Sequence, residues 1–372
     1  MTRALILGTL PGQVDAIDAL KQRGLEVHAC GHQRVGPGVT AADRFWEVDI
    51  TDVSAVRDLA ESIDAQLVYS VGSDIAMPTV VGVSEALGLP HFHSSELTEV
   101  LRSKTLTRER LDAASLSPVA HLRVGPADDA NDWAVFPAFV KPVDSQGQRG
   151  ISVVSDRAQL QAALAEARSA TRSGEVIVEE VLQGPEVSIH VFVDDGEVRF
   201  FLPSDRYVWD GPMVGVAESH AIPLAPATQG AHDSLRELVA QCVAALGVTD
   251  GPLYFQTIVT SDGPRIIEIA SRLDGCHMWR LIKMTTGFDF LDAVLGRLLG
   301  DPWPDIPEEP AAEPMTLRFF LDSPDVLATD EYLAATATPD ALFVDLQVPR
   351  GERPRRTNDV VARFGYEIYR GF

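Results

Sequence analysis

Cysteine is scarce in this chain of 372 residues, which contains only Cys30, Cys242 and Cys276. Three cysteines so far apart exclude a disulfide framework, and no two of them have the CxxC spacing of a zinc site. This usage is typical of a reducing compartment. We therefore expect a cytoplasmic protein.

Basic residues are also few, because 31 Lys and Arg stand against 54 Asp and Glu and leave a formal net charge of −23. Binding to nucleic acid without sequence preference needs clustered Lys and Arg at the phosphates. We expect no nucleic-acid partner. An anionic substrate would have to meet a local group of positive charges.

Long apolar runs are missing at the N-terminus, where the stretch in MTRALILG is short and is followed by Asp15 and Asp18. That stretch is too brief for the apolar core of a signal peptide or for a membrane span. We expect a soluble protein that has no membrane partner.

The first ninety or so residues alternate between apolar runs and amphipathic segments. The segments ALILG, LEVHACG and AQLVYSVG are typical of strands, and QVDAIDALKQRG and SAVRDLAESID of helices. This alternation predicts a parallel sheet with right-handed crossovers. The turn GTLPGQ lacks the third glycine of GxGxxG, which argues against a nicotinamide site, although its amides could bind a carboxylate or phosphate.

A second unit begins near Ser94 with the helical segment SSELTEVLRSKTLTRERLDAASL, which Pro118 closes. The stretch FPAFVKPVDSQGQRGISVV follows, with Lys141 at the end of its first apolar run. Gly147 and Gly150 let the backbone approach a ligand, and the amides between them can point at an anion. A solvent-exposed hairpin with a surface lysine explains the same residues, and the loop alone leaves both interpretations open.

The continuation EEVLQGPEVS places a short connector between two predicted strands. Its residues Glu179, Glu180, Val181 and Leu182 could contact an adenine edge through backbone groups, and Glu186 could accept from ribose hydroxyls. Edge-strand charges that discourage sheet pairing are the alternative.

A later hairpin, DGPLYFQTIVTSDGPRIIEIASRLDG, carries Gln256 on one arm and Glu268 on the other. Residues on paired strands can lie side by side. Oxygen ligands of this kind suit Mg²⁺, which completes its shell with phosphates and water. The hairpin is therefore a candidate metal site.

These motifs, in this order, resemble the ATP-grasp superfamily, and in particular its carboxylate–amine (L-amino-acid) ligases, over roughly residues 1–300. The resemblance implies an α/β and α+β fold, with a parallel-sheet pre-ATP-grasp domain at 1–93 and a two-lobed ATP-grasp domain at 94–300. A central lid at about 118–182 and a small C-terminal cap at 301–372 complete it. Its implied ATP-binding residues are Lys104, Lys141, Ser145, Gln146, Gly147, Gly150, Glu179, Glu180, Val181, Leu182 and Glu186.

The chain departs from the family pattern at the metal. Gln256 stands where the family usually has an acid, and Ala270 stands where an asparagine often helps to hold a second ion. The resemblance then implies at least one Mg²⁺ on Gln256 and Glu268, with Mn²⁺ as a substitute. On the substrate side it implies Arg206, Glu218, His220 and Arg272, although Glu218 and His220 are one residue closer together than in the amino-acid ligases.

The function implied is ATP-dependent amide or peptide bond formation. A carboxylate would be converted to an acyl phosphate, which Arg272 holds while Glu218 or His220 takes the proton of the attacking amine. The expected partners are small-molecule carboxylate and amine substrates, and a homodimer is compatible with the sequence. Two alternatives stay open: a bicarbonate-using, carboxylase-like enzyme, and a degenerate nucleotide-binding protein without turnover.

Overall fold

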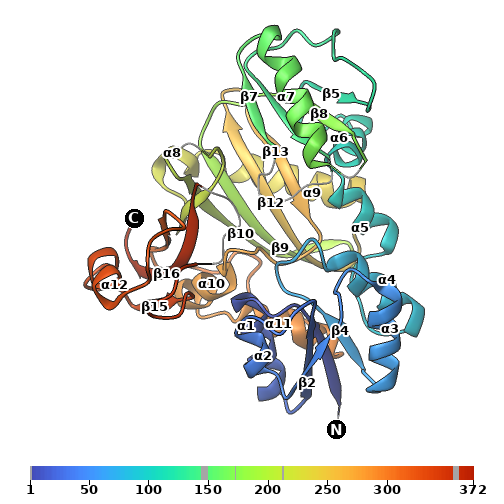
Figure 1. Cartoon of the computed structure of the whole chain (residues 1–372), viewed down its shortest axis with the longest axis vertical. Coiled ribbons are helices and arrows are strands. Elements are labelled where there is room, and N and C mark those ends of the chain that lie inside the picture. Colours follow the sequence, from blue (N-terminus) through green and yellow to red (C-terminus); the bar gives the residue numbers. More distant parts are fainter. Residues whose placement is uncertain (1, 144–149, 172, 212, 355–359) are drawn as a thin grey trace.

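The computed structural model describes residues 2–143, 150–171, 173–211, 213–354 and 360–372. Three sheets organise the chain, with an N-terminal sheet, a small sheet at the opposite end and a large sheet between them (Figure 1). In these ranges no helix is both long and apolar enough to cross a membrane. This mixture of one parallel and two antiparallel sheets confirms the expected fold class.

The N-terminal sheet is parallel and has the strand order β3-β2-β1-β4. The strands and helices expected from the alternating pattern are present. The short strand β3 and the helix α4 were not expected, because β3 is half exposed and α4 is apolar over most of its length. The elements are β1 (Arg3–Leu7), α1 (Pro11–Gln22), β2 (Glu26–Gly31), α2 (Gly38–Ala41), β3 (Arg44–Glu47), α3 (Val53–Ser62), β4 (Leu67–Tyr69) and α4 (Met77–Leu87).

The segment expected to be one helix after Ser94 is in fact two, α5 (Ser95–Arg102) and α6 (Lys104–Ala113). Ser103 has an extended backbone, and its hydroxyl accepts a hydrogen bond from the Leu106 amide. A serine in this role starts a new helix because it satisfies a backbone donor that the helix itself leaves unpaired. Lys104 is therefore the first residue of α6.

The small sheet is antiparallel, has the order β5-β8-β6-β7 and is covered by one helix. Because β6 pairs directly with β7, the glycine-containing loop does connect a hairpin. The elements are β5 (His121–Val124), β6 (Ala138–Pro142), β7 (Ser152–Val154), α7 (Arg157–Ala170) and β8 (Val176–Glu180). We refer to residues 121–180 as the lid sheet.

The large sheet has eight strands in the order β13-β12-β9-β10-β11-β14-β16-β15, all paired antiparallel. The last three come from the expected C-terminal cap, so this region continues the sheet. The elements are β9 (Glu186–Asp194), β10 (Glu197–Val208), β11 (Ala217–Ile222), α8 (Pro226–Gln229), α9 (His232–Leu246), β12 (Gly251–Thr260), β13 (Gly263–Ala270), α10 (Met278–Thr286), α11 (Phe290–Leu298), β14 (Met315–Asp322), α12 (Asp330–Thr336), β15 (Phe343–Leu346) and β16 (Ala362–Arg370).

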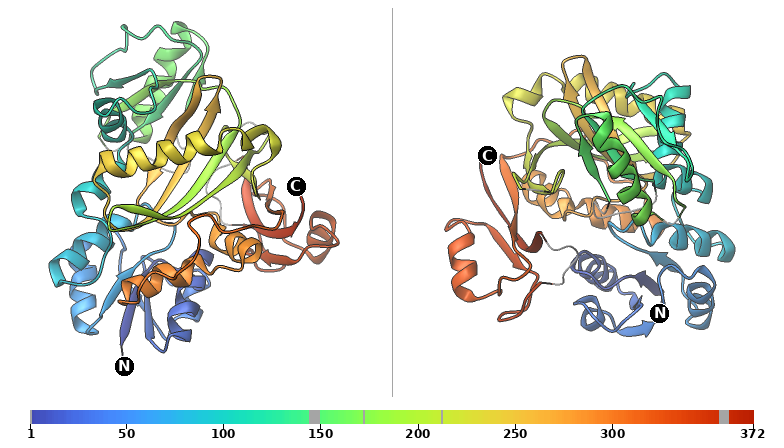
Figure 2. Two further views of the ribbon diagram at one scale, coloured as in Figure 1. Left: turned by 180° about the vertical axis from the view of Figure 1, so that it is seen from behind. Right: turned by 45° about the horizontal axis from the view of Figure 1, so that its top comes forward.

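The two faces of the large sheet differ in polarity. Along β9, Val187, Ile189 and Val191 join the apolar cluster beneath α9, which crosses the back of the sheet (Figure 2). Because neighbouring side chains on a strand point to opposite faces, Glu186, Ser188 and His190 in the first half of β9 lie on the other face. That polar face carries the candidate site.

Candidate active site

Lys141, at the end of β6, points to a carboxylate of its own sheet. Its Nζ lies 2.7 Å from Glu179 Oε2, and the other oxygen of Glu179 is 2.6 Å from Nε of Arg108 on α6. Burial alone would raise the pKa of Glu179, but Lys141 and Arg108 hold it well below its usual value. The carboxylate is thus charged and shared between two cations.

Arg108 also connects the lid sheet with the large sheet. Its Nη1 donates to the carbonyl of Ile266 on β13 at 2.7 Å, two residues before Glu268. Glu179 therefore acts here through its side chain, as the centre of a buried charge network. This differs from the backbone role in adenine contact that the sequence suggested for it.

Three predicted phosphate-binding residues, Ser145, Gln146 and Gly147, lie outside the described residues. Gly150 is described and has a φ of +68°. A Cβ at this position would lie 2.7 Å from Ala170 Cβ and 3.0 Å from Pro142 Cγ. Glycine is therefore required here for the backbone conformation and for packing against α7, in addition to any contact with a ligand.

The predicted adenine connector follows β8. The Val181 amide donates to the Pro137 carbonyl at 3.1 Å, and the Glu180 amide donates to the Ala120 carbonyl at 3.0 Å. The Glu180 side chain accepts from the Ala120 amide at 2.8 Å. These amides already donate hydrogen bonds to neighbouring backbone carbonyls. Contact with adenine at Val181 and Leu182 would therefore have to use other backbone groups.

Glu186 receives two donors on the polar face of the large sheet. Its Oε2 accepts from Arg206 Nη1 at 2.5 Å and from Gln256 Nε2 at 2.9 Å. The same guanidinium donates to the Gly215 carbonyl at 2.7 Å. Glu186, Arg206 and Gln256, predicted for the ribose, the substrate side and the metal, thus form one hydrogen-bonded group on three adjacent strands.

Gln256 and Glu268 pair directly across β12 and β13, as the sequence predicted. The register of the two strands shifts immediately after Gln256, and both side chains are partly exposed. Directly opposed residues of an antiparallel pair lie on the same face. An amide oxygen and a carboxylate at this position fit the oxygen chemistry of Mg²⁺ or Mn²⁺.

Arg272 follows β13 and is buried, and its ion-pair partner comes from a distant segment of the chain. Its Nε and Nη2 bind the two oxygens of Asp74, each at 2.5 Å. Asp74 belongs to the loop after β4, and the loops meet where Gly72 abuts Gly275: a Cβ on Gly72 would lie 2.8 Å from Gly275 Cα. This pair joins the N-terminal domain to the polar face of the large sheet.

The two predicted bases differ in their surroundings. Glu218 lies at a bulge of β11, opposite the shift between Tyr207 and Val208, and is partly exposed. His220 pairs with Arg206 in register but is fully buried, and burial lowers its pKa to about 3. A histidine held neutral in this way is a weak proton acceptor near neutral pH, which favours Glu218 of the two.

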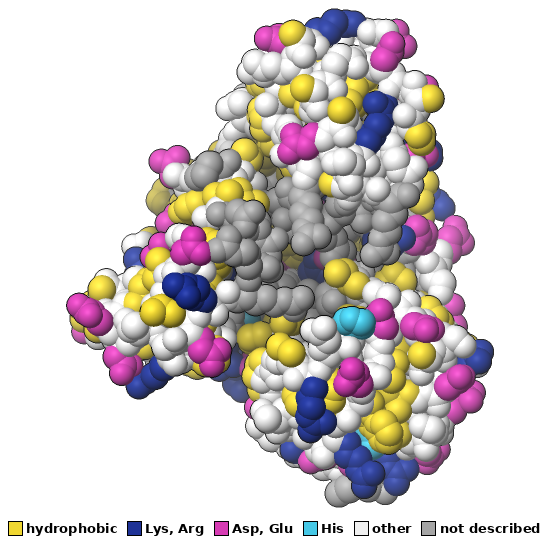
Figure 3. All heavy atoms as spheres, viewed as in Figure 1, with side chains coloured by type: hydrophobic (Ala, Val, Ile, Leu, Met, Phe, Trp, Pro, Cys, Tyr) yellow, Lys and Arg dark blue, Asp and Glu magenta, His cyan; other side chains and the backbone are white. Residues whose placement is uncertain are grey.

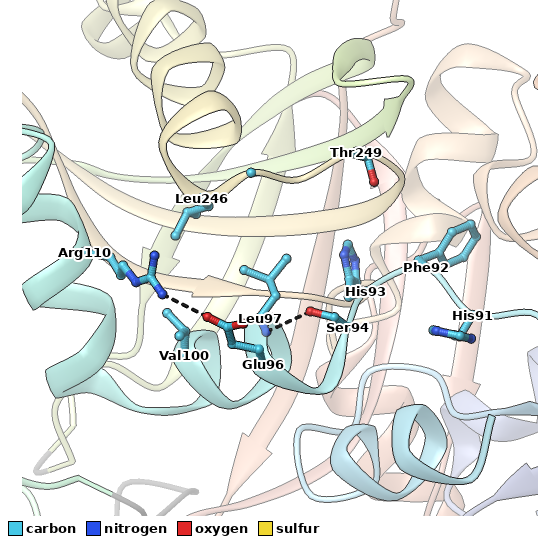
Figure 4. A pocket seen from close by; sticks show the side chains of 11 residues that line it. His91, Phe92, His93, Ser94, Glu96, Leu97, Val100, Arg110, Leu246 and Thr249 are labelled. Atoms are coloured by element: carbon cyan, nitrogen blue, oxygen red, sulfur yellow. Dashed lines mark hydrogen bonds and ion pairs between the residues drawn. The ribbon is translucent and has the colours of Figure 1, made fainter. Parts of the chain in front are cut away.

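A cavity of about 430 Å³ lies elsewhere, between the linker before α5 and the end of α9 (Figure 4). Glu96 and Arg110 form an ion pair of 3.2 Å at its edge, and none of the predicted site residues lines it. On the face shown in Figure 3, Lys and Arg are scattered among acidic side chains.

Comparison with known proteins places this site in a family. Residues 134–279 match the model of the ATP-grasp domain. Over this segment the chain is similar to ATP-grasp proteins. The structure of the L-amino acid ligase from Bacillus licheniformis superposes on this chain with a TM-score of 0.81 at 20% identity. The superposition covers 99% of this chain and 93% of the ligase chain. N5-Carboxyaminoimidazole synthetase from Staphylococcus aureus, complexed with ADP, gives 0.79 at 15% identity, over 99% and 93%.

Two of the sequence relatives are a ligase and a synthase by name. The chain is 28% identical over 74% of its length to phosphoribosylamine–glycine ligase of Methanococcus vannielii, whose sequence it covers to 68%. It is 27% identical over 64% of its length to dapdiamide A synthase of Enterobacter agglomerans, covering 60% of that protein. The chain thus spans only about three-fifths to two-thirds of these relatives.

Sequence reasoning missed two residues of the site: Asp74, which pairs with Arg272, and Arg108, which pairs with Glu179. Asp74 had a usable signal, since it follows a parallel strand at the sheet edge where ligands and connecting loops gather. Arg108 had none, because an arginine within a polar helix is normally solvated. The contacts of both residues became visible only in three dimensions.

Proposed function

We propose that this ATP-grasp protein is an ATP-dependent ligase that joins a small-molecule carboxylate to an amine and releases ADP and phosphate. The observation that carries the proposal is the pair of charge networks that converge on the β12–β13 hairpin. One runs from Lys141 through Glu179 and Arg108 to β13. The other joins Arg206, Glu186 and Gln256.

Lys141, Lys104 and the glycine-containing segment between β6 and β7 are assigned to the ATP phosphates, and residues 180–182 and Glu186 to the nucleoside. A lysine that gives up part of its contact with Glu179 brings a poorly solvated charge to a phosphate, where such a contact is strong. Arg108 would keep the carboxylate neutralised. Catalysis of phosphoryl transfer then rests on positioning and charge stabilisation.

Gln256 and Glu268 are assigned to Mg²⁺, which when bound would neutralise charge on the phosphate oxygens. Because one ligand is an amide, Glu268 provides the negative charge of the protein at this position. Gln256 must then present its oxygen to the ion while its Nε2 continues to donate to Glu186, an arrangement that orients the amide.

Arg272 is assigned to the acyl phosphate and Glu218 to the proton of the attacking amine, with His220 and Arg206 lining the acceptor side. The relatives named as phosphoribosylamine–glycine ligase and L-amino acid ligase support this reaction class. The two rivals, bicarbonate activation and nucleotide binding without turnover, predict different substrate dependence.

The test is ADP release from the full chain with ATP, Mg²⁺ and a panel of amino acids, dipeptides and hydroxy acids, with and without bicarbonate. Release that needs both an acid and an amine supports the ligase. Release with bicarbonate alone supports the carboxylase-like alternative, and ATP binding with no release under any condition supports the nucleotide-binding alternative.

A further inference from the structure

A second group of side chains on the polar face has the donors of a metal site. His220 comes from β11, and Asp274 and Cys276 come from the loop between β13 and α10. One ligand atom from each residue lies within 4.8 Å of the other two. The donors are an imidazole nitrogen, a carboxylate oxygen and a sulfur, brought together from separate parts of the chain.

Three polar atoms of this group are buried without partners in the described part of the chain, while Asp274 Oδ1 accepts a hydrogen bond from the Cys276 amide at 2.5 Å. His220 is 0% exposed and neither ring nitrogen has a hydrogen bond, and Asp274 is 4% exposed with Oδ2 unpaired. Nε2 of the neighbouring His190 is likewise unpaired. A buried polar atom without a partner is destabilising and rare in folded proteins, so several together point to a missing ligand.

The charges around the group are compatible with a cation. Arg206 is paired with Glu186, and Arg272 with Asp74. Arg363 stacks over the Phe319 ring at 3.6 Å and directs Nη2 towards Cys276 Sγ at 4.0 Å. A donor near sulfur is a suitable outer-shell partner for a metal-bound thiolate.

We propose that His220, Asp274 and Cys276 bind one divalent transition-metal ion of the Zn²⁺ type. Mixed nitrogen, oxygen and sulfur donors suit Zn²⁺ or Co²⁺, whereas Mg²⁺ needs oxygen donors. Three protein ligands leave a fourth tetrahedral position for His190, water or a substrate group. This ion is additional to the Mg²⁺ assigned to Gln256 and Glu268, and the proposal stands whether or not the chain is a ligase.

Ligand protonation agrees with this assignment. Burial lowers the pKa of His220 to about 3, so its ring is already in the neutral form that binds metals. Burial raises the pKa of the Cys276 thiol to about 11, and the ion must therefore displace one proton from sulfur. The thiolate and the Asp274 carboxylate together would balance a charge of +2.

The experiment is a Co²⁺ titration of the full chain under a thiol-free reductant, with excess Mg²⁺ to occupy the oxygen site. We expect one Co²⁺ per chain, a near-ultraviolet sulfur-to-cobalt charge-transfer band and the visible bands of tetrahedral cobalt. Zn²⁺ should abolish both signals by displacement. Only a sulfur ligand gives the first band, so Co²⁺ on Glu268 cannot imitate it.

Cys276→Ser should remove the charge-transfer band, and His220→Gln should weaken Co²⁺ binding by more than about tenfold, because even outer-shell losses cost roughly 10–100-fold. Cys242→Ser is the matched control, since Cys242 is buried beneath the opposite face of the sheet and should leave the spectrum unchanged. Circular dichroism checks that each variant folds. A folded wild-type chain without the band, or a band that survives in Cys276→Ser, would overturn the proposal.

Discussion

Lys141 and Glu179 form a buried ion pair of 2.7 Å, and Arg108 binds the free oxygen of the same carboxylate. The lysine assigned to ATP is therefore already oriented and poorly solvated before any ligand arrives. Such preorganisation lowers the cost of binding an anion. It also makes the residue important for stability, so the two effects must be measured separately.

Lys141→Met tests the phosphate assignment while keeping most of the side-chain volume against Phe139. We expect ATP affinity to fall at least about tenfold, because a poorly solvated charge contact is lost. Stability should fall by less than the roughly 3–5 kcal/mol typical of a broken buried pair, since Arg108 still neutralises Glu179. Isothermal titration measures the ATP affinity, and urea unfolding measures the stability.

Lys283→Met removes a surface pair with Asp289 and serves as the control. Unchanged ATP affinity in Lys141→Met would contradict the assignment.

The metal assignment is tested by a pair of variants in the β12–β13 hairpin. Gln256→Glu replaces the donor to Glu186 with a second carboxylate, so we expect a lower melting temperature in EDTA and its recovery with Mg²⁺. Glu268→Gln should lose Mg²⁺-dependent turnover while remaining folded. Differential scanning fluorimetry with and without Mg²⁺ measures the first effect. If Mg²⁺ does not raise the melting temperature of Gln256→Glu, the ion binds elsewhere.

Three buried histidines predict how stability depends on pH. Burial lowers the pKa of His220 to about 3 and those of His93 and His190 to about 4, below the ordinary value of 6.5. Between about pH 6.5 and pH 4 the unfolded chain therefore binds more protons than the folded one, and stability is lost as pH falls. Their combined slope is up to about 4 kcal/mol per pH unit.

Denaturant unfolding across that pH range measures this slope. His190→Phe should reduce the histidine part by roughly a third, while His91→Gln at an exposed position should leave it unchanged. A slope equal in wild type and His190→Phe would show that His190 is not held neutral.

Arg272 is expected to act in turnover more than in ATP binding. Arg272→Lys cannot reproduce two-point contact with a phosphoryl group or with Asp74, so we expect a large loss of turnover with ATP affinity nearly kept. Asp74→Asn provides the comparison, because it loosens the same pair but retains the guanidinium. If both variants lose turnover equally and have lower melting temperatures, the role of Arg272 is structural: it links the N-terminal domain to the large sheet through Asp74.

The sequence predicted those parts of the fold that depend on local patterns. The alternation in residues 1–93 indicated the parallel sheet, and Gln256 and Glu268 were placed side by side because a hairpin fixes its own register. The break at Ser103 was missed, since serine occurs both within and at the start of helices.

Which distant residues would pair with one another could not be predicted from the sequence. Nothing in the residues near Arg272 indicates Asp74, which lies 198 positions away. His220 and Cys276 belong to separate segments, yet their ligand atoms lie within 4.8 Å of each other. Pairings of this kind follow from tertiary packing, which local periodicity does not encode.

Trapping of an acyl phosphate by hydroxylamine tests the proposed ligase most directly. With ATP, Mg²⁺ and the correct acid but no amine, the full chain should form a hydroxamate and release one ADP for each one formed. Arg272→Lys should lose most of this signal and still bind ATP. If no acid among the amino acids, dipeptides and hydroxy acids yields a hydroxamate or stimulates ADP release, while ATP binds normally, carboxylate activation is contradicted.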